Sequence, residues 1–366
     1  MPVLFADDGT GGPVPWPDAV DEILRGDLVA ALAYVTPAGG AVATTVAPCG
    51  LVDRGRGTVS FTTSLGFGRK LERLVRDTST ALAFHTREHG FARAPGHVLV
   101  QGRSTVQLRV TPARVAEVTA HAERFLGPLR RGPVWDRLLR EYYADRVVVD
   151  VAVSRVATWP GPTVLNDPTA VNDPTAVDEP VVVGPPWPGP PPSQRPPKDG
   201  VGPRVEIART FRLVTALPHV VLAYRGADRL PVVVPVTVAG RDGGGLHLRG
   251  PLPPGRRRAG LLAHGFRPGL VGLHTRVLTG WLVCDDAGDG HYAPHTSSGV
   301  YAPPVKSLLL VSNGLLAKYG KWKGRGDRAS QGLTALLAAR EAADAAAATG
   351  ADATPTGSSE PGDTGT

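Results

Sequence analysis

TVSFTTS (residues 58–64) opens the stretch that decides the fold, because its residues alternate in polarity with a period of two, as in a strand with one buried face. The following GRKLERLVRDT (68–78) changes to helical spacing, with its leucines on one side. ALAFHT (81–86) and HVLVQGRSTV (97–106) return to the strand pattern. The stretch therefore predicts a strand, a short amphipathic helix and two further strands.

The residues on either side extend this β-rich pattern. LVAALAYVTPAGGAVATTVAP (28–48) has two apolar runs around a Pro-Ala-Gly-Gly turn, which is typical of a hairpin. Residues 112–143 have helical spacing, and RVVVDVAVSRVATW (146–159) predicts a closing strand. About six short strands with two helices indicate a small closed or split barrel.

Much of this pattern occurs a second time, about 190 residues later. ALAYV at 31–35 aligns with VLAYR at 221–225, and the strand at 58–62 aligns with 245–249. We also align 81–86 with 270–275, and 100–102 with 278–280, in the same order along the chain. The repeat predicts a tandem duplication. The expected fold class is therefore mainly β, with two tandem split β-barrels that form a pseudo-dimer within one chain.

Composition separates the barrels from the rest of the chain. Residues 160–203 hold 14 of the 36 prolines and include the direct repeat NDPTAV-NDPTAV, which indicates an extended linker. We expect a first barrel at 18–159, this Pro-rich linker at 160–203 and a second barrel at 204–326. At 327–366 we expect an Ala-rich segment followed by a disordered tail.

Several classes of protein do not fit the composition. The 45 Gly and 36 Pro among 366 residues argue against a mostly helical protein. The net charge is +7, but the arginines are scattered, so we expect no nucleic-acid partner. No apolar run approaches the ~18 residues that span a bilayer, and no signal peptide is visible, so we expect a cytoplasmic protein without a membrane partner. Cys49 and Cys284 lack metal-site spacing, and no metal site is predicted.

The order of features over 58–102 resembles the pyridoxamine 5′-phosphate oxidase-like, FMN-binding split-barrel family. In that family a strand ending in Thr-Asn or Thr-Thr precedes a Ser/Gly-Arg-Lys turn that opens a helix, and a strand of the form x-Val-x-Val-x-Gly comes later. Here these places are taken by Thr62-Thr63, by Gly68-Arg69-Lys70 and by HVLVQG (97–102). The resemblance covers most of 25–159 and returns more weakly over 212–312. It implies an FMN-dependent oxidoreductase whose cofactor lies in a groove between two barrels.

The residues around the turn also predict an anion site by themselves. Arg69 and Lys70 stand where a helix begins, so two cations join free backbone N–H groups and the positive end of the helix dipole. The hydroxyls of Thr62, Thr63 and Ser64 end the preceding strand and can donate to phosphate oxygens. By the resemblance, Thr62, Thr63, Arg69 and Lys70 would bind the FMN phosphate, and the Ser64 hydroxyl joins them as a candidate.

The resemblance also indicates residues for the flavin ring. His97 falls where the oxidases carry a glutamine that faces the ring, and Trp281 with His274 are the candidates from the second copy. The turn of the second copy, at 249–258, has lost the hydroxyls and gained prolines, so we expect one flavin per chain. His85 and His274 look equivalent in the two copies, which fits a shared structural position better than a metal site.

The predicted function is an FMN-dependent oxidoreductase of the pyridoxamine 5′-phosphate oxidase-like type, acting on a small-molecule substrate, with no catalytic residue assigned. Residues 42–48 lack the basic side chains that true pyridoxamine phosphate oxidases use, so vitamin B6 chemistry is not implied. A deazaflavin-dependent reductase and a non-catalytic flavin- or haem-binding protein are the alternatives. The oligomeric state is open between a monomeric pseudo-dimer and a homodimer.

Overall fold

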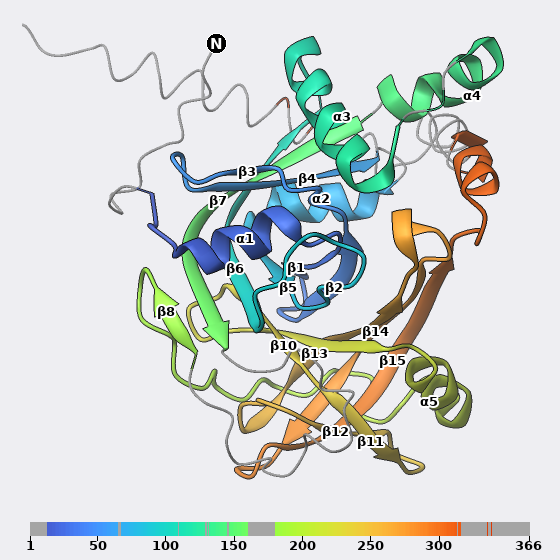
Figure 1. The fold of residues 1–366 in the computed structure, drawn as a ribbon. Coiled ribbons are helices and arrows are strands. Elements are labelled where there is room, and N and C mark those ends of the chain that lie inside the picture. Colours follow the sequence, from blue (N-terminus) through green and yellow to red (C-terminus); the bar gives the residue numbers. More distant parts are fainter. Residues whose placement is uncertain are drawn as a thin grey trace, which may run out of the picture.

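The computed structural model describes residues 13–64, 67–108, 110–128, 130, 132–144, 146–159, 180–312, 314, 315, 335 and 338. In this part of the chain, two antiparallel sheets form two halves that lie one against the other (Figure 1). The NDPTAV repeat lies outside the described residues, as does the tail expected at 350–366.

The first half contains residues 58–106, the stretch that predicts a strand, a helix and two further strands. Its strands are β1 (Ala30–Val35), β2 (Ala41–Val46), β3 (Val52–Asp53), β4 (Thr58–Ser64), β5 (Ser79–Phe84), β6 (His97–Gln107) and β7 (Arg146–Trp159). Its helices are α1 (Asp18–Gly26), α2 (Gly68–Arg76), α3 (Pro112–Leu126) and α4 (Pro133–Ala144). A bridge between Ala47, just after β2, and Thr62 of β4 joins the two sides of the sheet and partly closes it into a barrel.

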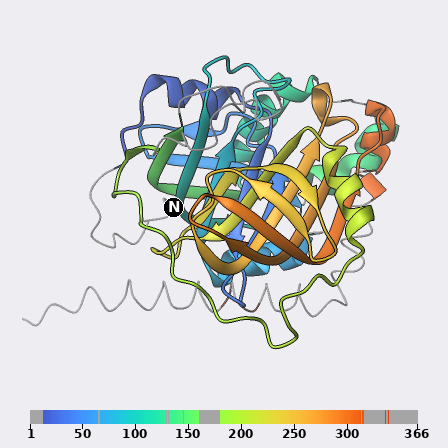
Figure 2. The same cartoon turned by 90° about the horizontal axis from the view of Figure 1, so that it is seen from below.

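The second half follows the same plan with fewer helices. Its elements are α5 (Ile207–Thr215), β9 (His219–Arg225), β10 (Pro231–Pro235), β11 (Thr237–Arg241), β12 (Leu246–Arg249), β13 (Gly255–Gly265), the 3₁₀ turn η2 (Pro268–Leu270), β14 (His274–Cys284) and β15 (Asp289–Tyr301). Figure 2, seen from below, shows the curled strands of this half in front of the first half.

The order of the strands is the same in both sheets. It runs β2-β1-β5-β6-β7-β4-β3 in the first sheet and β10-β9-β13-β14-β15-β12-β11 in the second. Each of the strands β1 to β7 therefore has one counterpart among β9 to β15. The expected mainly β fold with two tandem split-barrel halves is confirmed.

The strand registers confirm most of the sequence alignment between the halves and correct one part of it. Gln101 and Thr279 both precede a bulge at the same place in their sheets, as aligned. The match of 81–86 with 270–275 is wrong, because β5 corresponds to β13 and thus His85 to His264. The cause is a missing helix: 14 residues including α2 connect β4 to β5, whereas only residues 250–254 connect β12 to β13.

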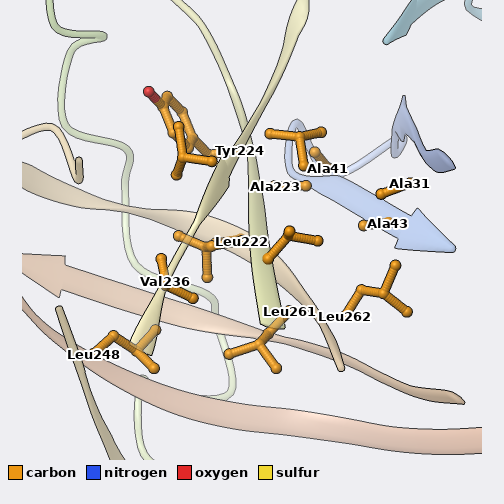
Figure 3. Close-up of a cluster of buried hydrophobic side chains, with 14 of the residues drawn as sticks. Ala31, Ala41, Ala43, Leu222, Ala223, Tyr224, Val236, Leu248, Leu261 and Leu262 are labelled. Atoms are coloured by element: carbon orange, nitrogen blue, oxygen red, sulfur yellow. The ribbon is translucent and has the colours of Figure 1, made fainter. Parts of the chain in front are cut away.

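Small side chains form the face that the first half turns toward the second. Ala31 and Ala33 of β1 share a buried cluster with the core of the second half, whereas Leu32 between them points into the core of the first. Alternation in β2 and β5 adds further alanines to the same face. Figure 3 shows Ala31, Ala41 and Ala43 lying against Leu222, Ala223 and Leu262. Because methyl groups occupy little space, the two sheets approach closely.

The contacts between the halves have an approximate twofold relation. β2 contacts β13 and β14, and their counterparts β10, β5 and β6 contact one another in the same way. Gln101 Nε2 donates to the Pro231 carbonyl at 2.6 Å, and the Gln101 side-chain oxygen accepts from Arg155 at 3.0 Å. Arg155, which is 5% exposed, also forms an ion pair with Asp228 of the second half at 2.6 Å. The interface resembles that of a homodimer, made within one chain.

The end of the Pro-rich segment lies against both halves. β8 (Val181–Val183) pairs with β7, and the Gln194 side chain donates to the Gly39 carbonyl and accepts from the Arg258 backbone. Residues 180–203 thus add a strand to the first sheet and cross to the second half. The domain boundaries at 160, 204 and 327 stay predictions.

Gly260 lies where the backbones of the two halves approach closely. A Cβ atom there would lie 2.5 Å from the Ala41 carbonyl oxygen, which belongs to the other half. We expect Gly260→Ala to lower the free energy of unfolding by about 3 kcal/mol, because a backbone atom cannot move aside easily. Gly240→Ala in β11, where the nearest atom lies 3.9 Å away, is the matched control, with an expected change within about 0.5 kcal/mol. Equal urea midpoints for the two variants would contradict this packing.

Candidate functional site

The end of β4 brings three hydroxyl side chains together. Thr62, Thr63 and Ser64 are half-buried, whereas the residues at the start of the strand are buried. β7 holds them on one side, with Val148 opposite Thr62 and Arg146 opposite Ser64. The strand therefore leaves the barrel at this point with its polar residues at the rim.

α2 begins four residues after β4 ends, with its first turn uncapped. Leu71 and Leu74 are buried and fix the helix on the barrel. No side chain caps the N-terminus at Phe67, and the first turn holds no acidic residue. α3 and α5, by contrast, are capped by Thr111 and Glu206. The first N–H groups of α2 thus lack the side-chain acceptor that helices usually have, which favours an anion there.

Two cations stand in this first turn. Arg69 is exposed, and Lys70 is half-buried with its Nζ 4.7 Å from the centre of the Phe67 ring. Burial lowers the pKa of Lys70 to about 8. Among the described residues, no carboxylate forms an ion pair with either cation. A desolvated ammonium without a counter-ion is unfavourable unless a ligand supplies the charge.

Thr63 points to the same conclusion from the strand side. Its Oγ1 is buried and has no hydrogen-bond partner in the described part of the chain. Buried hydroxyls without a partner are rare and costly. We refer to Thr62, Thr63, Ser64, Arg69 and Lys70 as the β4–α2 site. The structure brings these five predicted residues to one end of one strand and the start of the next helix.

A third basic residue, which the sequence did not indicate, lies beside the site. Arg146, the first residue of β7, lies opposite Ser64 and thus beside the end of β4. Its charge also reaches Cys49: burial raises the pKa of that thiol to about 11, and Arg146 opposes part of the increase. Arg146 begins the predicted closing strand, but only the antiparallel pairing of β4 with β7 shows where it lies.

His97 is not brought to this site. It is the first residue of β6 and lies opposite Trp159, whereas Thr63 lies opposite Val147, twelve residues earlier in β7. His97 is buried between the halves, with Nε2 donating to the Val233 carbonyl at 3.1 Å. The position of His97 opposite a flavin ring stays a prediction.

Trp281 and His274 occupy different environments in β14. Trp281 is 2% exposed, lies opposite Arg258 in β13 and has the Arg258 guanidinium 5.7 Å from its ring centre. A side chain buried this completely has almost no surface left for a ligand. His274 is half-buried, and its ring centre lies 5.6 Å from that of Tyr301.

A cluster of four histidines lies between the halves, where the approximate twofold axis passes. The equivalent residues His85 and His264 meet with their Nε2 atoms 2.9 Å apart, and the rings of His97 and His219 lie about 6 Å from His85. His85 Nδ1 donates to the Ala83 carbonyl, so its Nε2 accepts the single proton shared with His264. Burial lowers the pKa of His97 to about 4 and of His264 to about 3, and that of His85 well below its usual value. His85, His97 and His264 are therefore neutral at pH 7.

Comparison with known proteins gives distant structural similarity only. No family model matches the sequence, and no curated protein matches it. Solved structures similar to part of the chain include a conserved hypothetical protein of Mycobacterium tuberculosis (17% identity, TM-score 0.30), which aligns with 41% of this chain and 88% of its own. Another is a pyridoxamine 5′-phosphate oxidase-related, FMN-binding protein of Nostoc punctiforme (14% identity, TM-score 0.28; 41% and 86% covered). A third, from Clostridium acetobutylicum, is related to a general stress protein of the pyridoxinephosphate oxidase family (10% identity, TM-score 0.27; 38% and 84% covered).

None of the described helices is both long enough and apolar enough to cross a membrane.

Proposed function

We propose that the chain binds FMN by its phosphate at the β4–α2 site and acts as a flavin-dependent oxidoreductase on a small molecule. The observation that carries the proposal is the combination of a desolvated, unpaired Lys70 with the orphaned Thr63 hydroxyl beside an uncapped helix N-terminus. Each of these three features is unfavourable alone and is relieved by a bound phosphate.

The residues present fit the phosphate end of the cofactor. Arg69 would bind two phosphate oxygens through its planar guanidinium, and Lys70 would add a point charge. Thr63 Oγ1 would donate its proton to a third oxygen, and the N–H groups of α2 would complete the cradle. The order of strand, turn and helix at 58–76 is also the part of the sequence that resembles FMN-binding split barrels.

The chemistry of such a site would be that of the cofactor. FMN, when bound, supplies hydride or electron transfer, and the protein binds, orients and shields it. In this chain, β4 and α2 would fix the phosphate, and the second half would close the groove that a partner subunit closes in a homodimer. One copy of the chain would then suffice, because its two halves already form the pair.

The proposal is tested on the purified chain. Any bound cofactor is released by denaturation and identified by mass, which separates FMN from a deazaflavin or haem. The protein freed of cofactor is then titrated with FMN, with quenching of flavin fluorescence as the readout. We expect saturable binding of one FMN per chain. A haem-containing protein, or one that fails to bind FMN at micromolar concentration, would refute the proposed function.

Thr63→Val separates the role of the hydroxyl from that of the methyl groups. The substitution keeps the shape of the side chain and removes the orphaned Oγ1. We expect FMN affinity to fall by about 10- to 30-fold, the value of one hydrogen bond to a charged group, with no loss of stability in the apo-protein. Thr58→Val, at the buried start of the same strand, is the control and should leave FMN affinity unchanged. Unaltered affinity in Thr63→Val would place the phosphate elsewhere.

A further inference from the structure

The second half brings together a carboxylate and two imidazoles that the proposed function does not use. Asp242 lies in the turn between β11 and β12, His247 lies in β12, and His291 lies in β15. His247 Nε2 is 3.2 Å from Asp242 Oδ2, and His291 Nε2 is 3.1 Å from Asp242 Oδ1. We propose that this trio, Asp242, His247 and His291, binds a divalent transition-metal ion of the Zn²⁺ class.

The strand pairing explains why the two imidazoles share a face. His247 lies directly opposite His291 in the antiparallel pair of β12 and β15, so both side chains leave the same side of the sheet. Their ring centres are 5.4 Å apart, at an interplanar angle of 74°. Both rings turn Nε2 toward the same carboxylate, which is the arrangement of two ligands that converge on one point.

The turn that carries Asp242 is built to hold its carboxylate still. Oδ1 accepts from the backbone N–H of Gly244 at 2.7 Å and of Gly245 at 2.9 Å. Cβ atoms at these two glycines would lie 3.1 Å from His291 Cε1, so the glycines let the turn lie against the ring without displacing it. Oδ2 has His247 as its neighbour and keeps a lone pair for a metal ion.

The distances fit a small borderline ion. Two ligands bound to one tetrahedral Zn²⁺ at about 2.0–2.2 Å lie about 3.3–3.6 Å apart. His247 Nε2 lies 3.2 Å from Asp242 Oδ2, close to this spacing. The three ligand atoms all lie within 4.8 Å of one another. Nitrogen and carboxylate donors in this ratio suit Zn²⁺, Ni²⁺ or Co²⁺ better than Ca²⁺ or Mg²⁺, which prefer oxygen. All three side chains are partly exposed, so water can take the fourth position.

The trio is separate from the β4–α2 site. It belongs to β11, β12 and β15 at the far edge of the second half, whereas α2 and β4 lie in the first half (Figure 1). A bound ion would tie the β11–β12 hairpin to β15. Its expected effects are therefore on the stability of this edge and not on the affinity for FMN.

The experiment is a calorimetric titration of the full, chelator-treated chain with zinc chloride. We expect the wild type to bind one Zn²⁺ ion per chain tightly and to melt at a higher temperature when Zn²⁺ is bound. His291→Ala and Asp242→Asn should weaken binding by about 100-fold or more, because even residues that merely support metal ligands are worth about 10- to 100-fold. Asp242→Asn keeps an oxygen for the Gly244 and Gly245 N–H groups, so its metal-free melting temperature should match that of the wild type.

His295→Ala is the matched control, because His295 is a partly exposed histidine of the same strand outside the trio. It should bind Zn²⁺ like the wild type. The proposal fails if the wild type binds no Zn²⁺ at micromolar concentration, or if the trio variants bind as tightly as the control. FMN affinity is measured on the same samples and should be equal in all of them.

Discussion

Replacing Arg69 by alanine and Lys70 by methionine together is expected to lower the affinity for FMN by about 100- to 1,000-fold. Each cation would contribute a charge-assisted hydrogen bond to the phosphate, worth about 1.5–2 kcal/mol, and the two act on the same group. Fluorescence titration of the apo-protein with FMN measures the change. Arg76→Ala is the control, since Arg76 lies in the last turn of α2 and pairs with Glu72. It should leave the affinity within about twofold.

The same double variant, which loses affinity for FMN, should gain stability as the apo-protein. Lys70 is charged below a pKa of about 8 and is desolvated without a counter-ion, so its charge weakens the empty fold. Methionine of similar length should stabilise the apo-protein by about 1–2 kcal/mol at pH 7, as measured by urea unfolding. The pKa of Lys70 is lower in the folded than in the unfolded chain. The stabilisation by methionine is therefore full below pH 8 and declines as pH rises beyond it. A variant that loses both stability and affinity would indicate a structural role for Lys70 instead.

Acid is expected to destabilise the protein strongly between pH 6.5 and 4. His97 and His264 have folded pKa values of about 4 and 3, and His85 is shifted in the same direction. As pH falls through 6.5, the unfolded chain binds protons that the folded chain does not. Each such histidine lowers the free energy of unfolding by about 1.4 kcal/mol per pH unit. The contribution of His97 alone is about 3 kcal/mol at pH 4.

Carboxylates near these histidines modify the dependence of the free energy of unfolding on pH. Asp27, which is fully buried and paired with Arg87, has its pKa raised to about 7, so the folded state takes up a proton there as pH falls. That uptake offsets about one histidine over this range. Glu88, 3.0 Å from His219, adds a carboxylate at the edge of the cluster. The net loss is therefore that of about two histidines.

Substitution of His264 tests the origin of the slope. His264→Asn keeps a donor for His85 and removes one proton site, so the dependence on pH should weaken by up to about 1.4 kcal/mol per pH unit. His89→Asn is the control, because His89 is exposed and has a φ of 56°, which asparagine adopts readily. Equal slopes for wild type and His264→Asn between pH 6.5 and 4, measured by urea unfolding, would contradict the assignment.

Local patterns in the sequence predicted most strands of the first half and the helix α2 well, because their periodicity is set within a few residues. β7 spans 146–159 as expected, and residues 112–143 form α3 and α4. The duplication was also visible, since equivalent strands keep their apolar pattern. Its alignment failed at β5, because the loss of α2 in the second copy changed the spacing while His274 offered a false match for His85.

The sequence could not predict those site residues that become neighbours only when strands distant in the chain pair. The β4–α2 site lies within nine residues of sequence and was foreseen as a unit. Arg146, the pair of His85 with His264, and the Asp242 trio each depend on which strands become neighbours. His97 was predicted from its place in the resemblance and Trp281 as a candidate from the second copy, and burial between or within the halves decided their environment. No local pattern encodes these outcomes.

The preference for FMN over riboflavin tests the central claim most directly, because the two ligands share the ring and differ in the phosphate. The apo-protein is titrated with each under identical conditions. A phosphate held by Arg69, Lys70 and Thr63 predicts that FMN binds about 100-fold or more tightly than riboflavin, and that Arg69→Ala/Lys70→Met removes most of this preference. Equal affinity of the wild type for the two flavins would contradict the account.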